Sequence, residues 1–129
     1  MKNLQMFCLT LNEKHLNKIQ LLNYTPVGLG ENRFSSEWFS DKSGETIYKK
    51  NPFYGEYTFH YWIWKNYLNK IQTEWVGFCQ YRKFWLMKEK TDIKNILDLK
   101  DLVINKIPDD FNKYESIIGD PFFVNQFRF

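Results

Sequence analysis

Short runs of apolar residues with polar borders recur along the chain, and their lengths are typical of buried β-strands. They cover residues 4–11, 24–30, 75–79 and 114–119. Segments in which apolar residues have helical spacing separate several of these runs. This alternation of strands and helices predicts an α/β fold with a mostly parallel sheet and flanking helices.

Residues 52–68 form the longest predicted helix. Asn51 and Pro52 are typical of its start, because asparagine caps free N–H groups and proline fits the first helical turn. Apolar and aromatic side chains occur around nearly its whole circumference. This pattern predicts that the helix is buried on most sides, with Trp62 or Trp64 among its least exposed residues.

Two further helices are predicted from weaker signals. Residues 13–22 place apolar side chains at helical spacing. Thr91 is a candidate cap for a later helix that Pro108 ends. The residues of that helix expected to face inward are Ile93, Ile96, Leu97, Val103 and Ile107.

Composition and charge narrow the possible functions. The 129 residues suffice for a single domain spanning residues 1–129. A net charge of +3 is small for a nucleic-acid-binding domain, so no nucleic-acid partner is expected. No apolar run approaches the ~20 residues of a transmembrane helix. Aromatic residues make up 19%, which suits either a dense core or a surface that stacks on sugars or bases.

Cysteine and histidine usage points away from disulfides and metal. Cys8 and Cys79 lie in apolar stretches and are expected to be buried free thiols, which together with the absence of a secretory signal pattern predicts a cytoplasmic protein. The chain has two histidines, whereas a structural zinc site takes about four Cys or His ligands at close spacing. The pair Asp109-Asp110 lies in a polar connection and is interpreted as a loop. We therefore expect no metal site.

The most informative polar cluster is Gln80-Tyr81-Arg82-Lys83, which directly follows the predicted strand 75–79. In open α/β sheets, ligands bind beyond the carboxyl ends of the strands. Two cations at such a position suit an anionic ligand, because an arginine can hold phosphate oxygens with two hydrogen bonds. A solvated strand end is the alternative interpretation.

Polar residues of the predicted helix 52–68 are also candidates. Glu56 and His60 lie one helical turn apart, which fits either a catalytic acid–base pair or a hydrogen-bonded pair inside a buried helix. Lys65 and Asn66 lie near the end of the helix, where a lysine compensates the helix dipole and an asparagine makes local hydrogen bonds. From spacing alone, both pairs keep a structural interpretation.

Two blocks of the sequence resemble a known family. They are DKSGETIYKKNPFYGEYTFHYWIWKN at residues 41–66 and GFCQYRKF at residues 77–84. The pattern resembles the DUF4422 family, which is associated with glycosyltransferases of capsule and surface-polysaccharide gene clusters. The resemblance is strong over residues 24–85 and weaker from there to the C-terminus. The chain departs from the family pattern at Glu45-Thr46, where Asp-Asn is usual, and at Gln80, where His is usual.

The resemblance implies a fold and a set of site residues. The implied fold is GT-A-like, that is, Rossmann-like, and the chain resembles the N-terminal, donor-binding half of longer family members, so that it would be incomplete at its C-terminus. The implied ligands are a nucleotide-sugar donor, taken to be a UDP-sugar, and a glycan or lipid-linked glycan acceptor. The residues that fall on the motif or its turn are Asp41, Asn51, Glu56, Lys65, Asn66, Gln80, Tyr81, Arg82 and Lys83.

The leading hypothesis is a nucleotide-sugar-dependent glycosyltransferase, or its donor-binding half, acting in surface-polysaccharide synthesis. Arg82 and Lys83 would balance the charge of the departing diphosphate in place of a metal. Glu56 would bind ribose or sugar hydroxyls, and Asp41 would order a loop or contact the donor. No catalytic residue is assigned.

The alternative hypothesis is a non-catalytic fragment that interacts with carbohydrate or protein, which the aromatic content and the short length favour. The apolar C-terminal residues bear on this choice, because a truncated chain would leave them uncovered or pack them against a second copy. They are Phe122, Phe123, Phe127 and Phe129.

Overall fold

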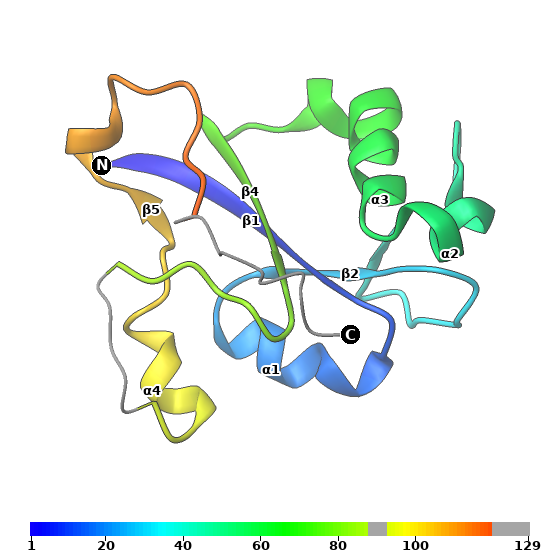
Figure 1. The fold of residues 1–129 in the computed structure, drawn as a ribbon, viewed down its shortest axis with the longest axis horizontal. Helices are drawn as coiled ribbons and strands as arrows, with labels where there is room; N and C mark the ends of the chain where they lie inside the picture. The colour runs from blue at the N-terminus through cyan, green and yellow to red at the C-terminus, as the bar shows by residue number, and fades with distance from the viewer. Residues whose placement is uncertain (88–92, 120–129) are drawn as a thin grey trace, which may run out of the picture.

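The computed structural model describes residues 1–87 and 93–119 and contains a five-stranded, mostly parallel sheet (Figure 1). Strands β1 (Lys2–Thr10), β2 (Thr25–Gly28), β3 (Phe39–Ser40) and β4 (Trp75–Gln80) are parallel and lie in the order β3-β2-β1-β4. The short β5 (Lys106–Ile107) pairs antiparallel with the start of β1. The α/β fold with a mostly parallel sheet is therefore confirmed.

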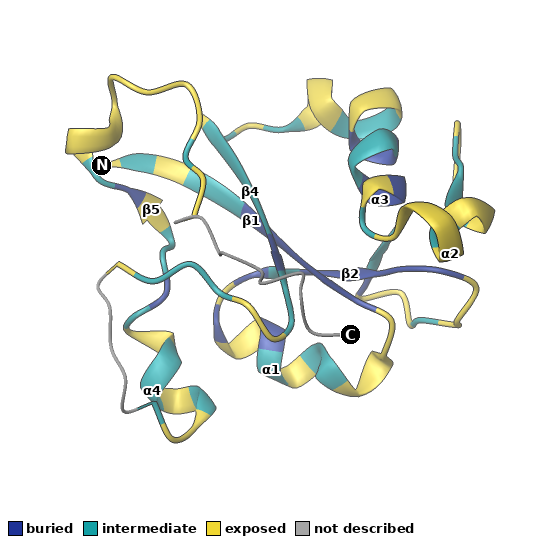
Figure 2. Ribbon diagram, viewed as in Figure 1, coloured by how far each residue is buried: buried dark blue, intermediate teal, exposed yellow. Residues whose placement is uncertain are grey.

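Strand β1 lies at the centre of the sheet and is buried on both faces. Its alternate residues belong to two separate cores, as the pleat requires. Met6 and Cys8 pack in the core under α1 (Leu16–Leu21) and α4 (Ile96–Lys100). Phe7 and Leu9 pack in the core under α3 (Tyr57–Trp62). Figures 1 and 2 show α1 and α4 on one side of the sheet and α3 on the other, with buried residues in α1 and α3.

The two cysteines lie side by side at the middle of the sheet. Cys8 of β1 is in register with Cys79 of β4, and both are buried free thiols, as the sequence predicts. A hydrogen bond with Cys8, together with burial, raises the pKa of the Cys79 thiol well above its usual range. Both side chains therefore behave as small apolar core residues.

The predicted helix 52–68 is instead a broken helical arm, a name used here for residues 48–70. It starts with the 3-10 turn η2 (Tyr48–Lys50) and α2 (Asn51–Tyr54). It continues through α3, the π-helical turn η3 (Ile63–Tyr67) and the 3-10 turn η4 (Leu68–Lys70). The break lies at Gly55, whose φ of 53° is in the left-handed region that glycine adopts without strain.

The burial expected for this helix is correct for its inner face and wrong for its outer face. Phe59 is fully buried and Trp62 is 8% exposed, so the expectation for Trp62 is confirmed. Trp64 is 61% exposed and Phe53 is 87% exposed. Aromatic residues in the sequence predict burial, but four of the nine Phe, Tyr and Trp residues of this arm are exposed.

The region after β4 differs most from the sequence-based expectation. The helix there, α4, is five residues long, and Asn95 caps it in a reciprocal pair with Asp98. Val103 and Ile107 are buried as expected, but outside that helix. Residues 114–119 form no strand in the described structure. The proposed cap Thr91 and the four C-terminal phenylalanines lie outside the described residues.

The segment 13–22 is helical as predicted, with the 3-10 turn η1 (Glu13–His15) leading into α1. Asp109 and Asp110 belong to another 3-10 turn, η5 (Asp109–Phe111), and Asp109 pairs with the N-terminal amine at 2.6 Å. Within residues 1–87 and 93–119, none of the helices has the length and apolar character needed to cross a bilayer.

The two cores predict a sharp contrast between two phenylalanines of the helical arm. Phe59→Ala should lower the free energy of unfolding by about 3–5 kcal/mol, because it leaves a cavity between α3 and the sheet. Phe53→Ala should change it by less than about 0.5 kcal/mol, because the ring is in solvent. Urea unfolding followed by tryptophan fluorescence measures both. Equal effects of the two substitutions would contradict this account of the arm.

Candidate functional site

The strand order creates a switch point between β1 and β4. From β1 the chain adds β2 and then β3 on one side, and it later returns to place β4 on the other side. The four parallel strands end at the same edge of the sheet, at Thr10, Gly28, Ser40 and Gln80. In open α/β sheets, the crevice at the carboxyl edge beside a switch point is where ligands bind.

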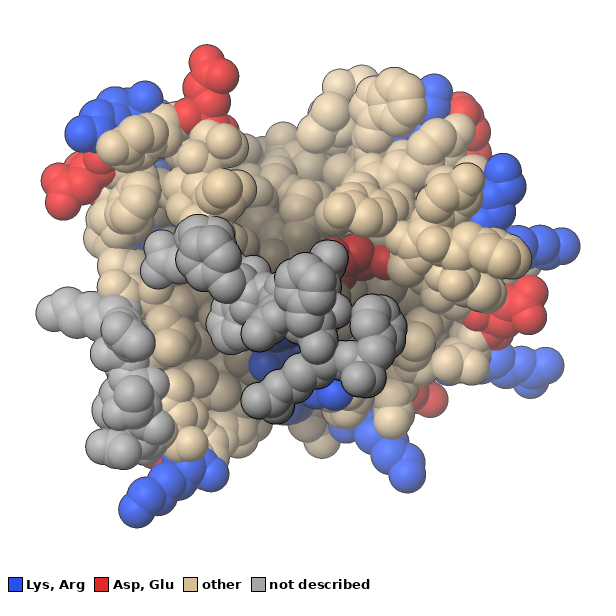
Figure 3. Space-filling view, viewed as in Figure 1, with Lys and Arg blue, Asp and Glu red and all other residues tan. Residues whose placement is uncertain are grey.

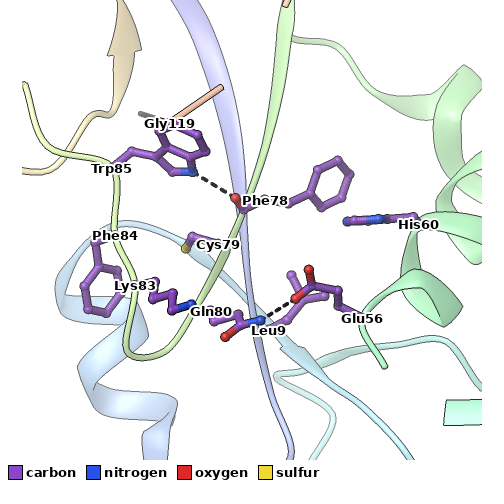
Figure 4. Close-up of a pocket in the computed structure, with 10 residues that line it drawn as sticks. All are labelled: Leu9, Glu56, His60, Phe78, Cys79, Gln80, Lys83, Phe84, Trp85 and Gly119. Atoms are coloured by element: carbon purple, nitrogen blue, oxygen red, sulfur yellow. Dashed lines mark hydrogen bonds between the residues drawn. The ribbon is translucent and has the colours of Figure 1, made fainter. Parts of the chain in front are cut away.

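Two cavities lie at this edge, one on each side of a shared wall. Leu9 of β1, Gln80 of β4 and Glu56 line both cavities. One cavity, of about 400 Å³, is called here the Arg82 cavity; its further lining is Thr10, Leu11, Asn12, His15, Leu29, Asn51, Gly55, Tyr81 and Arg82. The other, of about 510 Å³, is called the Lys83 cavity; its further lining is His60, Phe78, Cys79, Lys83, Phe84, Trp85 and Gly119 (Figure 4).

The shared wall is a hydrogen bond between Glu56 and Gln80. The Gln80 Nε2 donates to Glu56 Oε2 at 2.5 Å (Figure 4). The turn at Gly55 places Glu56 just before α3, so that its side chain reaches the end of β4. This bond uses one carboxylate oxygen of Glu56, and a carboxylate can accept several further hydrogen bonds from a ligand. The structure therefore brings together two residues that the sequence placed 24 positions apart.

The loop after β4 carries the two cations. The Lys83 amide donates to the Gln80 carbonyl at 2.9 Å, which closes a tight turn and sends the two cationic side chains to different cavities. Arg82 lines one cavity, with its guanidinium carbon 5.2 Å from the centre of the Tyr81 ring. Lys83 lines the other and points toward Gln80 in Figure 4. Both side chains are exposed, so neither takes part in a buried ion pair.

Residues after β1 complete the Arg82 cavity, and sequence reasoning missed them. The His15 ring stacks on Tyr81 with 3.9 Å between ring centres. The Thr10 hydroxyl lies 2.7 Å from His15 Nδ1 and accepts the Asn12 amide at 3.1 Å. Because the hydroxyl proton is then free to donate to Nδ1, the arrangement favours the tautomer with a proton on Nε2.

Electrostatics keeps the histidine of this cavity neutral. Partial burial and the nearby Lys18 lower the pKa of His15. At neutral pH the ring is thus a hydrogen-bond donor rather than a cation. In open α/β sheets, ligands bind beyond the carboxyl ends of the strands. This rule applies to β1 as well as to β4, so it could have predicted Asn12 and His15 as site residues.

His60 is the other histidine of the site and faces the Lys83 cavity from α3. Its ring packs against Phe78 with 4.2 Å between ring centres (Figure 4). Burial lowers the pKa of His60, and Glu56 opposes that effect only in part. Its Nε2 is buried and has no hydrogen-bond partner among the described residues. The Glu56–His60 pair of the sequence is therefore near the site, but each residue makes its contact separately.

A buried polar network behind the Arg82 cavity holds the break in the helical arm. Thr58 Oγ1 donates to Asp41 Oδ2 at 2.6 Å. Asn51 Nδ2 donates to the Gly55 carbonyl at 2.8 Å and approaches Thr58 Oγ1 at 3.3 Å. Asn51 lines the cavity, whereas Asp41 is fully buried behind it. Asp41 therefore acts on the site through Thr58 and the arm, which fits the ordering role considered for it.

Lys65 and Asn66 lie away from both cavities. Asn66 accepts the Glu45 amide at 3.0 Å and donates to the Glu45 carbonyl at 2.9 Å, so it holds the loop that follows β3. Lys65 pairs with the Glu45 carboxylate at 3.4 Å and lies over the Trp64 ring. The structure gives these two residues local structural contacts.

Among residues 1–87 and 93–119, there is also no group of three or more His, Cys, Asp or Glu side chains arranged to hold a metal ion.

These features define an α/β protein with a divided, ligand-sized cleft at the switch point of a parallel sheet. The chain belongs to the DUF4422 family, a domain of unknown function, whose model matches residues 8–126. No curated protein and no solved structure matches the chain significantly. The family resemblance of the sequence is thus confirmed over most of the chain, including every residue that lines the two cavities.

The network behind the cavity predicts a pH effect on stability. Burial raises the pKa of the Asp41 carboxyl above its usual range, despite the opposing hydrogen bond from Thr58. The folded state therefore binds this proton more tightly than the unfolded state, and the resulting stabilisation is lost as the pH rises through the raised pKa. Relative to Asp41→Asn, the wild-type chain should lose unfolding free energy as the pH rises from about 4 to 7.

Asp109→Asn provides a control with the opposite sign. The hydrogen bond with the N-terminal amine lowers the pKa of Asp109, so its stabilisation is present above the unfolded pKa and is lost at acid pH. Urea unfolding across the pH range measures both slopes, and a constant offset from the substitution does not affect them. Slopes of the same sign for the two variants would refute the assignment of Asp41.

Proposed function

We propose that the chain is a nucleotide-sugar-dependent glycosyltransferase, or the donor-binding half of one, with a GT-A-like arrangement of its sheet. The observation that carries the proposal is the pair of cavities joined at the β1–β4 switch point, each with its own cation. A nucleoside diphosphate sugar has two arms on either side of a diphosphate. A divided cleft with cations near its dividing wall matches that shape and charge.

The side chains suggest how the donor is held. Arg82 and Lys83 follow the same strand end and face different cavities, so a diphosphate that crosses the wall at its Gln80 end, away from the Glu56 carboxylate, meets both cations. The guanidinium of Arg82 can bind two phosphate oxygens at once. Glu56 repels phosphate and accepts hydrogen bonds, so its partners are the ribose or sugar hydroxyls. This division agrees with the roles expected for the three residues from the sequence.

Neutral donors complete the proposed donor site. The Nε2–H of His15 and the side-chain Nδ2 of Asn12 lie on the Arg82 side, where they can donate hydrogen bonds to uracil or ribose oxygens. The stack of His15 on Tyr81 holds both rings in place before the ligand arrives. Pre-positioned rings lose less entropy on binding. We therefore assign the nucleoside to the Arg82 cavity and the sugar to the Lys83 cavity.

The chemistry follows from this placement. In sugar transfer, the bond between the anomeric carbon and the diphosphate oxygen breaks, a bond to an acceptor hydroxyl oxygen forms, and the hydroxyl proton is released. Negative charge grows on the departing diphosphate, and fixed cations stabilise that charge. Arg82 and Lys83 are proposed to do this in place of a metal. The acceptor is proposed to be a glycan or a lipid-linked glycan.

Arg82 provides the central test of the proposed donor site. Arg82→Ala should weaken the binding of UDP roughly 10- to 100-fold, because it removes a charge-assisted hydrogen-bonding group from the phosphates. Since Arg82 is exposed, the unfolding midpoint should stay unchanged. Arg33→Ala is the matched control, because Arg33 is also exposed and lies outside both cavities. Isothermal titration with UDP, with and without Mn²⁺, measures the affinity.

Several results would contradict the proposal. UDP and UDP-sugars that fail to raise the unfolding free energy of the wild-type chain at saturating concentration would exclude the donor site; about 2.7 kcal/mol is expected at 100 times the Kd. Binding that needs Mn²⁺ and survives Arg82→Ala would exclude the metal-free arrangement. Binding of UDP without release of sugar from any UDP-sugar would restrict the chain to a donor-binding role.

A further inference from the structure

The helical arm presents an aromatic face to solvent. Its inner face is buried against the sheet through Thr58, Phe59, Trp62 and Ile63. Its outer face carries large apolar side chains that are about half exposed or more: Phe53 at 87%, Tyr54 at 52%, Tyr57 at 65%, Trp64 at 61% and Leu68 at 49%. Figure 2 shows the exposed outer side of α2 and α3. Scattered exposed apolar residues are ordinary, but a run of them along one arm marks an interaction surface.

Lysines surround this aromatic face. Lys49 and Lys50 precede α2, and Lys65 and Lys70 lie at the other end of the arm; all four are exposed. The acidic residue of the arm, Glu56, is turned into the cavities and bonded to Gln80. Next to the arm, Glu45 is held by Lys65 and by the Tyr61 hydroxyl at 2.6 Å. Figure 3 shows Lys and Arg atoms at the margin of an otherwise uncharged surface over these helices, beside a smaller number of acidic atoms.

We propose that the outer face of the helical arm docks on an anionic lipid bilayer. Exposed Trp, Tyr and Phe rings bordered by lysines are the side chains that settle at the bilayer interface. The rings enter the boundary between headgroups and acyl chains, and the lysines lie at the level of the anionic phosphates. The charge of the arm is complementary to such a surface.

A carbohydrate surface fits these contacts less well. Sugars stack on the free face of an aromatic ring, whereas the Lys65 ammonium lies 4.0 Å from the centre of the Trp64 ring and covers one face. The Tyr61 ring also has Lys65 at 5.8 Å, and its hydroxyl is bonded to Glu45. A lysine held over an aromatic ring presents its charge to a phosphate without losing the cation–π contact.

Docking would set the orientation of the cleft. Asn51 and Gly55 line the Arg82 cavity, and Phe53 and Tyr54 lie between them in the sequence on the outer side of α2. A bilayer under α2 would therefore lie beside the mouth of that cavity. The consequence that a lipid-linked acceptor reaches the site rests on the proposed function, whereas docking itself does not.

The test is sedimentation of the whole chain with vesicles. We expect binding to vesicles of phosphatidylcholine and phosphatidylglycerol in equal parts, weaker binding at about 0.5 M salt, and little binding to phosphatidylcholine alone. The double variant Phe53→Ser/Tyr57→Ser should reduce partitioning at least about tenfold. Lys49→Gln/Lys50→Gln should reduce it roughly 30-fold.

Matched controls come from the opposite side of the molecule. Phe111→Ser/Tyr114→Ser removes another pair of exposed aromatic residues, beside η5, and Lys100→Gln/Lys113→Gln removes two other exposed lysines (Figure 1). Both controls should bind vesicles much as the wild-type chain does, after allowance for net charge. Because every substituted side chain is exposed, unfolding midpoints should be unchanged, and UDP titration of the arm variants separates docking from the donor site.

Three outcomes would overturn the proposal. The first is equal binding, or no binding, of the wild-type chain to anionic and neutral vesicles. The second is a loss of binding in the control variants as large as in the arm variants. The third is the absence of vesicle binding combined with self-association or glycan retention that the arm variants abolish, which would assign the aromatic face to a second copy or to a glycan.

Discussion

The burial of β1 on both faces is the constraint on which the rest of the structure depends. A central parallel strand needs helices on both sides and a crossover connection to each neighbour. Met6 and Cys8 require α1 on one face, and Phe7 and Leu9 require α3 on the other. Once β2 occupies one edge of β1, β4 has to take the other edge, and this change of direction places the ends of β1 and β4 beside each other. The cleft is thus a consequence of how the core is covered.

The polar interactions around the cleft connect this core to the helical arm. Asp41 follows β3, and its hydrogen bond to Thr58 fixes the beginning of α3. Glu56, next to the Gly55 turn, bonds to Gln80 at the end of β4. The arm is therefore held to the carboxyl edge from two different strands. Because each bond is partly or wholly buried, its loss would cost more than a surface contact of the same length.

The sequence predicted the elements whose signals are local. Strands β1, β2 and β4 correspond to apolar runs. Gln80, Arg82 and Lys83 follow such a run and line the cavities at the carboxyl edge, while their role in ligand binding stays a prediction. The structural role considered for Lys65 and Asn66 agrees with their contacts, but their partner could not be predicted, because Glu45 lies about 20 positions away and a local pattern carries no such information. The helix after β4 was misplaced because Val103 and Ile107 are buried through an irregular connection and an antiparallel strand. The outer face of the arm was predicted to be buried because aromatic residues usually are.

The side-by-side cysteines make the switch point observable. Cys8 and Cys79 are buried in register on the two strands whose ends form the cleft. Cys8 is fully buried, so a thiol reagent can reach it only when β1 and β4 separate or when the core above it opens, whereas Cys79 lines the Lys83 cavity. The rate at which Cys8 is labelled in the native state therefore reports local opening around β1 and β4, and a ligand that bridges the carboxyl ends of these strands would lower that rate. The labelling rate of Cys8 can thus report whether a ligand occupies the cleft, without an introduced probe.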